Sequence, residues 1–170
     1  RRFGWLREIY DRLTQAEVTH GNHSAEYKQL RQEVAEYFLQ FKLVPRIIDE
    51  LTHKLRYTVI SIREQEKLIQ DLCVQRIGMD KKDFQTSFKN HATNPHWIGL
   101  LLNSGKPYVP MLKHYYEELG RAQHKLITLE GQSRLKVVEI KDIHRRMSVG
   151  EAKARRAKKE MIEANLRLVI

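Results

Sequence analysis

The chain has 170 residues, of which 31 are Lys or Arg and 21 are Asp or Glu, so its formal net charge is +10. This length allows one helical domain with a sizeable core. The single cysteine, Cys73, excludes an internal disulfide framework and fits a reducing cytoplasm. Neither a secretory signal pattern nor a run of eighteen apolar residues is visible, so we expect no association with a membrane.

The apolar residues recur with helical spacing along the whole chain. This pattern predicts an all-α fold: a multi-helix bundle around one long central helix, followed by a basic C-terminal helix. The first helix is expected to run from Arg1 to a break at His20-Gly21-Asn22. Ser24 is predicted to cap a second helix, whose buried stripe would contain Tyr27, Leu30, Val34, Tyr37, Phe38 and Phe41.

The central helix is predicted to begin at Pro45, because proline fits the first turn of a helix. No Gly or Pro follows until Gly78, which gives a helix about 50 Å long. Cys73 lies beside the apolar stripe of this helix, so we expect a packed thiol and not a nucleophile. The stripe has heptad-like spacing and contains Ile48, Leu51, Leu55, Ile62, Ile69 and Leu72.

Two short helices are predicted next, one capped by Asp80 and one opened by Asn94-Pro95. The first would bury Phe84 and Phe88, and the second Trp97, Leu100 and Leu101. After a loop at Asn103 to Pro107, one amphipathic helix is predicted from Tyr108 to Leu129 and closed by Gly131. We expect its apolar side to share one core with the central helix.

A further helix is predicted from Val137 to Met147. Ser148 and Glu151 have the spacing of a capping box, with Met147 placed as a hydrophobic staple, so the terminal helix would start at Val149. A seam of small and apolar residues along it indicates close approach of another helix: Ala154, Ala157, Met161, Ala164 and Leu168. The final stretch, Leu166 to Ile170, is almost wholly apolar and needs burial. The sequence therefore predicts a fragment whose partner helices lie beyond Ile170.

The positive charge is concentrated at the C-terminal end. Residues 134–170 contain eleven Lys or Arg and five Asp or Glu, a net charge of +6, whereas the first 133 residues carry +4. We expect nucleic acid or an acidic protein surface to be met mainly here, although a solvated helix face explains the charges equally well. The candidate contacts are Lys153, Arg155, Arg156, Lys158 and Lys159.

The sequence contains no arrangement typical of a catalytic or metal site. His20 and His23 lie at a turn without a Cys or acidic partner, and the carboxylates alternate with Lys or Arg at helical spacing. We therefore predict a protein without enzymatic activity, cofactor, metal or small-molecule substrate.

The segment RRMSVGEAKARRAKKEMIEANLRLVI, which begins at Arg145, resembles the start of conserved region two in the primary (housekeeping) sigma factors of bacterial RNA polymerase. Upstream, FKLVP (41–45), QEKLIQDLC (65–73), MDKKDF (79–84) and the stretch from Trp97 to Pro107 resemble the variable insertion that precedes this region. The resemblance implies two parts: residues 1–132 as the helical insertion domain and residues 133–170 as the truncated beginning of region two.

In this family, the parent protein is a non-enzymatic initiation factor that directs RNA polymerase to promoters and helps to open the minus-ten element. The resemblance implies that the insertion contacts the β′ subunit and influences promoter escape. By position, Asn165 and Leu168 match residues that help to line the pocket for a flipped promoter base, and Arg167 lies beside them. The alternative interpretation is a stand-alone helical adaptor or a non-specific nucleic-acid-binding module.

Overall fold

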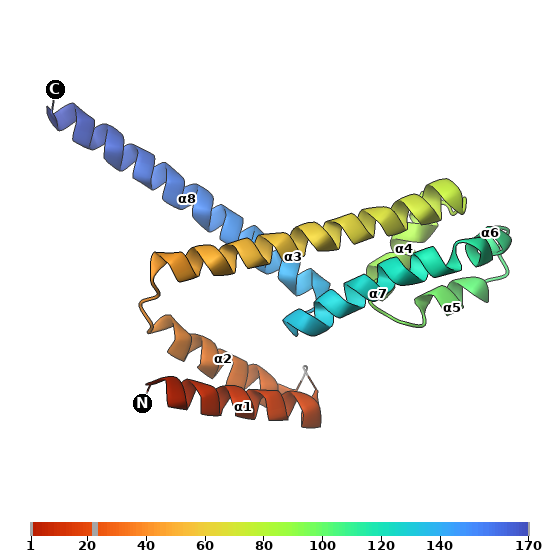
Figure 1. Cartoon of the computed structure of the whole chain (residues 1–170), viewed down its shortest axis with the longest axis horizontal. Helices are drawn as coiled ribbons and strands as arrows, with labels where there is room; N and C mark the ends of the chain where they lie inside the picture. Colours follow the sequence, from red (N-terminus) through yellow and green to blue (C-terminus); the bar gives the residue numbers. More distant parts are fainter. Residues whose placement is uncertain (1, 22–23, 170) are drawn as a thin grey trace. The chain divides into compact units, whose positions relative to one another are not determined.

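The computed structural model describes residues 2–21 and 24–169; of residues 2, 3, 20, 90, 168 and 169 it describes the backbone only. Within these ranges every regular element is a helix, which confirms the predicted all-α fold (Figure 1). No helix among the described residues is long and apolar enough to cross a membrane. The α-helices are α1 (Arg2–His20), α2 (Ala25–Leu39), α3 (Pro45–Asp71), α4 (Lys81–His91), α5 (Trp97–Leu102), α6 (Val109–His114), α7 (Tyr116–Ser133) and α8 (Val137–Val169).

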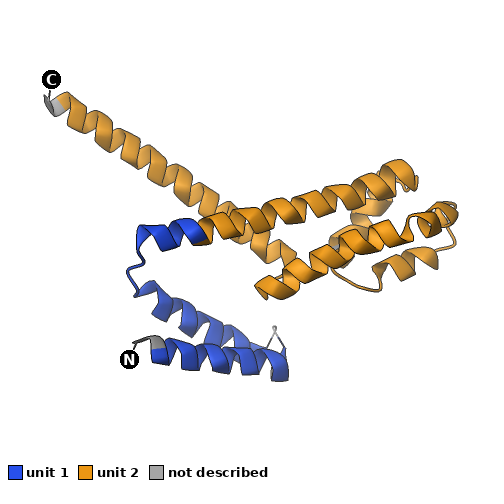
Figure 2. Ribbon diagram, viewed as in Figure 1, with its two compact units in different colours: residues 1–50 blue, residues 51–170 orange. Residues whose placement is uncertain are grey.

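The chain forms two compact units, residues 1–50 and residues 51–170 (Figure 2). The first contains α1 and α2, which pack side by side. Ser24 caps α2 as predicted, since its hydroxyl accepts a hydrogen bond from the Tyr27 amide at 3.1 Å. The buried side chains of this unit are Ile9 and Ala16 on α1 and Tyr27 and Leu30 on α2.

The predicted stripe of α2 is only partly buried. Tyr37 lies against Trp5, with ring centroids 3.9 Å apart, whereas Phe38 remains 40% exposed. Successive residues differ by about 100° around a helix, so one partner helix cannot cover both Tyr37 and Phe38. Placing Phe38 in the buried stripe was therefore wrong.

The second unit has one continuous apolar core. The side chains of Ile62 and Ile69 on α3 and of Leu119 and Leu126 on α7 are all 0% exposed and belong to the same cluster. This confirms the predicted core between the central helix and the later amphipathic segment. By contrast, Leu51 on α3 is 52% exposed, so the predicted stripe is buried only toward the C-terminal end of the helix.

Trp97 joins the short helices to this core. Its side chain is 0% exposed, its ring lies edge-on to Phe84 and Phe88, and its Nε1 donates a hydrogen bond to the Ser87 hydroxyl at 2.7 Å. Asp80 caps α4 as predicted, with Oδ2 accepting from the Lys82 amide at 2.9 Å. In α5 the predicted burial of Leu100 was wrong, because it is 56% exposed while Ile98 is buried instead.

The central helix ends in a π-helical turn, Leu72–Arg76, and does not continue as an α-helix to Ile77. Gly78 terminates it as predicted, with a φ of +78° that glycine adopts without steric cost. The widened turn is closed by the Ile77 amide, which donates to the Leu72 carbonyl at 2.9 Å.

The single helix expected from Tyr108 to Leu129 is instead divided into α6 and α7. Tyr115 lies between them with φ −93° and ψ 11°, outside regular helical geometry. At this position Arg76 lies over the Tyr115 ring, 5.8 Å from its centroid, and also approaches Glu118 at 3.9 Å. The distortion therefore coincides with a contact from the π-helical turn.

Gly131 does not end α7, contrary to expectation. The helix continues to Ser133 and ends at Arg134, whose φ of 52° is left-handed. Two side chains form hydrogen bonds at this helix end. The Ser133 hydroxyl donates to the Leu129 carbonyl at 2.8 Å, and a Glu130 carboxylate oxygen accepts from the Val137 amide at 3.2 Å. Glu130 thus connects the end of α7 to the start of α8.

We predict that Leu119→Asp will lower the free energy of unfolding of the chain by about 3–5 kcal/mol, because it places an unpaired carboxylate in a fully buried position. Thermal and urea unfolding followed by circular dichroism will measure the change. Leu100→Asp is the matched control, since the same substitution at an exposed site should cost little. Equal losses in both variants would contradict the observed core.

Candidate nucleic-acid interface

The basic C-terminal segment belongs to one uninterrupted helix. The predicted break before Val149 was wrong, because α8 runs from Val137 to Val169 and includes Ser148 and Gly150. The carboxylate of Glu151, expected to close a capping box, instead accepts a hydrogen bond from Arg56 Nη2 on α3 at 2.5 Å. The Glu151 carboxylate, which the local pattern assigned to the Ser148 amide, thus binds Arg56, 95 positions away in the sequence.

Besides the hydrogen bond from the Val137 amide to Glu130, three attachments of described residues hold the first half of α8 in its unit. The first is burial of Val137 and Ile140 in the core. The second is the ion pair between Lys141 and Glu66, with a shortest separation of 2.5 Å, and the third is Glu151 with Arg56. The two pairs are ten residues apart on each helix, and the later residue of α8 pairs with the earlier residue of α3. The two helices are therefore antiparallel where they cross, over about 15 Å (Figure 1).

The start of α8 is also stabilised by a local group. Lys136 provides no side-chain acceptor, but Glu139 accepts a hydrogen bond from the Lys136 amide at 3.1 Å. Together with Glu130, this carboxylate satisfies amides at the helix N-terminus, where negative charge is favoured.

Beyond Glu151 the side chains of residues 152–167 are all exposed. Two of the basic residues are neutralised locally, Arg156 by Glu160 at 2.9 Å and Lys159 by Glu163 at 3.7 Å. Within the described part of the chain, Lys153, Arg155 and Lys158 have no carboxylate within ion-pair distance. These three cations are therefore available to phosphate groups.

The candidate DNA contacts do not share one side of α8. Asn165 and Arg167 are both exposed, but two positions correspond to about 200° around a helix, so their side chains leave on opposite sides. Leu168 lies within α8, and its side chain is outside the described residues. Arg155 and Lys158, three positions apart, do share a side.

The small-residue seam predicted to approach another helix has no partner among the described residues. Ala154, Ala157 and Ala164 are exposed, and Met161 is 67% exposed. Helix packing along this seam therefore stays a prediction.

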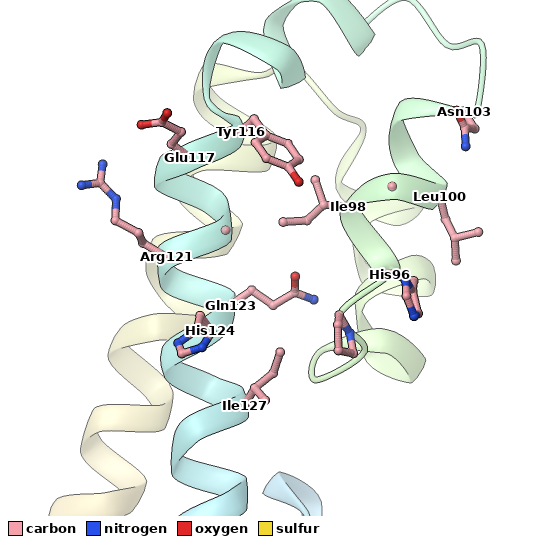
Figure 3. Close-up of a pocket in the computed structure, with 13 residues that line it drawn as sticks. His96, Ile98, Leu100, Asn103, Tyr116, Glu117, Arg121, Gln123, His124 and Ile127 are labelled. Carbon is pink, nitrogen blue, oxygen red and sulfur yellow. The ribbon is translucent and has the colours of Figure 1, made fainter.

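Sequence analysis did not identify a groove of about 820 Å³ between α5 and α7 (Figure 3). Gly99 and Gly120 line it, and a Cβ atom added to either would meet nothing within 4 Å. Tyr116 and Gln123 extend toward its centre, whereas Glu117 and Arg121 point away (Figure 3). Glycines on both lining helices were the only sequence signal for this space.

Gln123 is the polar anchor of the groove wall. It is only 3% exposed, and its Nε2 donates to the Asn94 carbonyl at 2.8 Å, which fixes the segment before α5 against α7. The acidic and basic side chains around the groove do not form a nucleophile with an adjacent base. The structure therefore describes a partly apolar groove whose wall is held by the buried carboxamide of Gln123.

The sequence matches a protein family described as "Sigma-70, non-essential region" over residues 1–130. The chain belongs to this family. It is also similar to the RNA polymerase sigma factor RpoD of Neisseria gonorrhoeae, with 30% identity over 168 residues. That alignment covers 99% of this chain and 26% of the relative, so this chain spans about a quarter of the relative's length.

Sigma factors are not enzymes, and no group of three or more His, Cys, Asp or Glu among the described residues is placed to hold a metal ion. Lys106, in the loop after α5, is paired with Asp83 on α4, and this hydrogen bond raises the pKa of Lys106. The loop is thus tied to α4.

Cys73 is a thiol in the core of the second unit. It is 1% exposed in the π-helical turn, and burial raises its pKa to about 12. The thiolate, which is the nucleophilic form, is therefore suppressed at neutral pH.

We predict that Cys73 will react with a thiol reagent such as DTNB much more slowly in the folded chain than in urea, at any pH between 7 and 9. Above the unfolded pKa of about 8.5 the unfolded thiol ionises while the folded one does not, so stability contributed by this group should fall as pH rises further. Absorbance at the two conditions measures both rates. Fast labelling without urea would show that the π-helical turn opens readily.

Proposed function

We propose that the chain comprises the insertion domain, residues 1–132, and the beginning of conserved region two, residues 133–170, of a primary sigma factor. In this proposal, the parent protein acts in the cytoplasm with RNA polymerase core, directs it to promoters and helps to open the minus-ten element. The match to the sigma-70 non-essential region and the similarity to RpoD along nearly the whole chain support it. The observation that carries the nucleic-acid part is the exposed basic half of α8.

Lys153, Arg155 and Lys158 are the cations that we assign to DNA phosphate or to an acidic polymerase surface. Among the described residues their charges have no carboxylate partner, so binding does not first require an existing ion pair to break. Arg156 and Lys159 contribute less because Glu160 and Glu163 compete for them. Phosphate contacts of this kind position a protein on DNA without reading its sequence.

Asn165 and Leu168, three positions apart on α8, are assigned to the pocket for a promoter base, as the resemblance to region two implies. Asn165 is exposed and its carboxamide offers both a donor and an acceptor to a base edge. Arg167 leaves the helix on the opposite side, which suits a phosphate or the polymerase and not the same base.

The insertion is assigned to contact β′ and thereby to influence promoter escape, again from the resemblance. We assign this contact to the groove between α5 and α7, because it is concave, partly apolar and anchored by buried Gln123. Such a surface can accept side chains of a partner protein without rearrangement of its walls.

A non-specific nucleic-acid-binding module is the second candidate function, since the exposed cations of α8 would by themselves bind any DNA. It differs from the first proposal in requiring no polymerase, so binding to the polymerase core discriminates between them.

We predict that the chain binds duplex DNA weakly, with similar affinity for promoter and scrambled sequences and a strong dependence on salt. The triple variant Lys153→Ala/Arg155→Ala/Lys158→Ala should reduce the slope of log affinity against log salt by about 2–3, since each lost phosphate contact contributes about 0.9. Fluorescence anisotropy at several salt concentrations measures both effects.

The matched control is Lys82→Ala/Lys113→Ala/Lys125→Ala, which removes the same net charge from exposed positions on α4, α6 and α7. Equal losses in the two triple variants would mean that total charge, and not α8, determines binding. A promoter preference that persists at high salt would contradict the phosphate-only mode.

The chain is also expected to bind RNA polymerase core and isolated β′ through the α5–α7 groove. Gly120→Leu should fill the groove and weaken binding at least tenfold without lowering the melting temperature, because a Cβ fits there and helix propensity rises. Biolayer interferometry with immobilised β′ measures affinity. Gly131→Leu, an exposed position in the same helix, is the control.

Two results would contradict this assignment in different ways. If the wild-type chain does not bind core or β′, the polymerase contact of the insertion is wrong. If binding is normal but Gly120→Leu leaves it unchanged, β′ docks elsewhere on the chain.

A further inference from the structure

The sequence from Ser148 to Glu151 favours the start of a new helix, whereas the structure has these residues in the middle of α8. A serine followed three residues later by glutamate is typical of a helix start, and Gly150 weakens a continuous helix. In the structure these residues nevertheless lie inside α8, and Ser148 does not act as a cap. Something outside the segment therefore stabilises the continuous form.

Arg56 is the group outside the segment that contacts it. Its guanidinium donates to the Glu151 carboxylate at 2.5 Å, and both side chains are partly buried, with 39% and 28% exposure. In a capping box the same carboxylate would turn back to the Ser148 amide, and Ser148 would leave helical geometry. Binding to Arg56 removes the acceptor on which the broken form depends.

Among the described side chains, Glu151 is also the last attachment of α8 to its unit. The core contacts of Val137 and Ile140 and the Lys141–Glu66 pair all lie before it, and residues 152–167 are exposed after it. The direction of the basic half of α8 relative to the 51–71 part of α3 is therefore transmitted only through the helix at residues 148–151.

We propose that Arg56 and Glu151 are a pair of positioning residues that keep α8 continuous and so fix the direction of its basic half. When the pair is absent, Glu151 and Ser148 form the capping box, and a new helix starts at Val149 and carries the basic residues in a new direction. A partly exposed ion pair and a helix cap make contributions of similar, small size, so loss of one is enough to populate the other form.

The test uses the whole chain without DNA or polymerase, so its outcome is independent of the proposed function. Nitroxide labels at Lys67→Cys on α3 and Ala157→Cys on α8, both exposed sites, report the direction of the basic half by electron–electron double resonance. The buried Cys73 is left in place because it is shielded from the reagent. Hydrogen exchange followed by mass spectrometry reports the amides of residues 148–151.

Arg56→Gln should add a second distance population and accelerate exchange at Val149 and Gly150 several-fold, since these amides lose their helical acceptors. Adding Ser148→Ala should restore the single distance and the protection, because alanine removes the cap and favours the helix. Glu66→Gln is the matched control: it breaks the other α3–α8 ion pair but leaves Glu151 with Arg56, and it should change neither readout.

The proposal is overturned if Arg56→Gln leaves the distance and the exchange rates as in the wild type. It is also overturned if Ser148→Ala fails to reverse the effect, since the released helix would then be frayed and not recapped. An equal effect of Glu66→Gln would show general loosening of α8 in place of a specific role for Glu151.

Discussion

Burial of one side of α3 against α7 is the constraint on which the rest of the second unit depends. Ile62 and Ile69 on α3 and Leu119 and Leu126 on α7 have no solvent exposure and belong to one buried cluster, and removal of this apolar surface from water stabilises the unit. The short helices attach to it through Trp97, and α8 attaches through Ile140. Without this core, α3 would not present Arg56 and Glu66 in the register that α8 requires.

The basic surface of α8 depends on which of its Lys and Arg side chains form ion pairs with glutamates and which remain unpaired among the described residues. Lys141 is paired with α3, while Arg156 and Lys159 are paired with glutamates four residues on. The eleven Lys and Arg of residues 134–170 therefore overstate the number of unpaired cations that a partner meets along the helix. In the proposed function Arg155 and Lys158 contribute most, because they lie side by side and have no such partner among the described residues.

The groove between α5 and α7 follows from short helices joined to a rigid wall. Gln123 is held by a backbone carbonyl of the segment before α5, which fixes the spacing of the two helices. Glycine at positions 99 and 120 then leaves space that larger side chains would fill. In the proposed contact with β′, a groove made in this way requires little conformational change on association.

The sequence by itself determined the all-α fold, the caps at Ser24 and Asp80 and the helix end at Gly78, because each depends on groups within a few residues along the chain. It also placed the positive charge on the C-terminal helix. The groove was not predicted, since its two walls are separated in sequence and are brought together only by packing.

The tertiary structure decided the points at which a distant group competes with a local signal. Arg56 engages Glu151, so the capping box at Ser148 does not form and α8 is continuous. Arg76 meets Tyr115 where the amphipathic pattern predicted an unbroken helix. Local propensities at such sites amount to about 1 kcal/mol, and a single tertiary contact of similar strength is sufficient to reverse them.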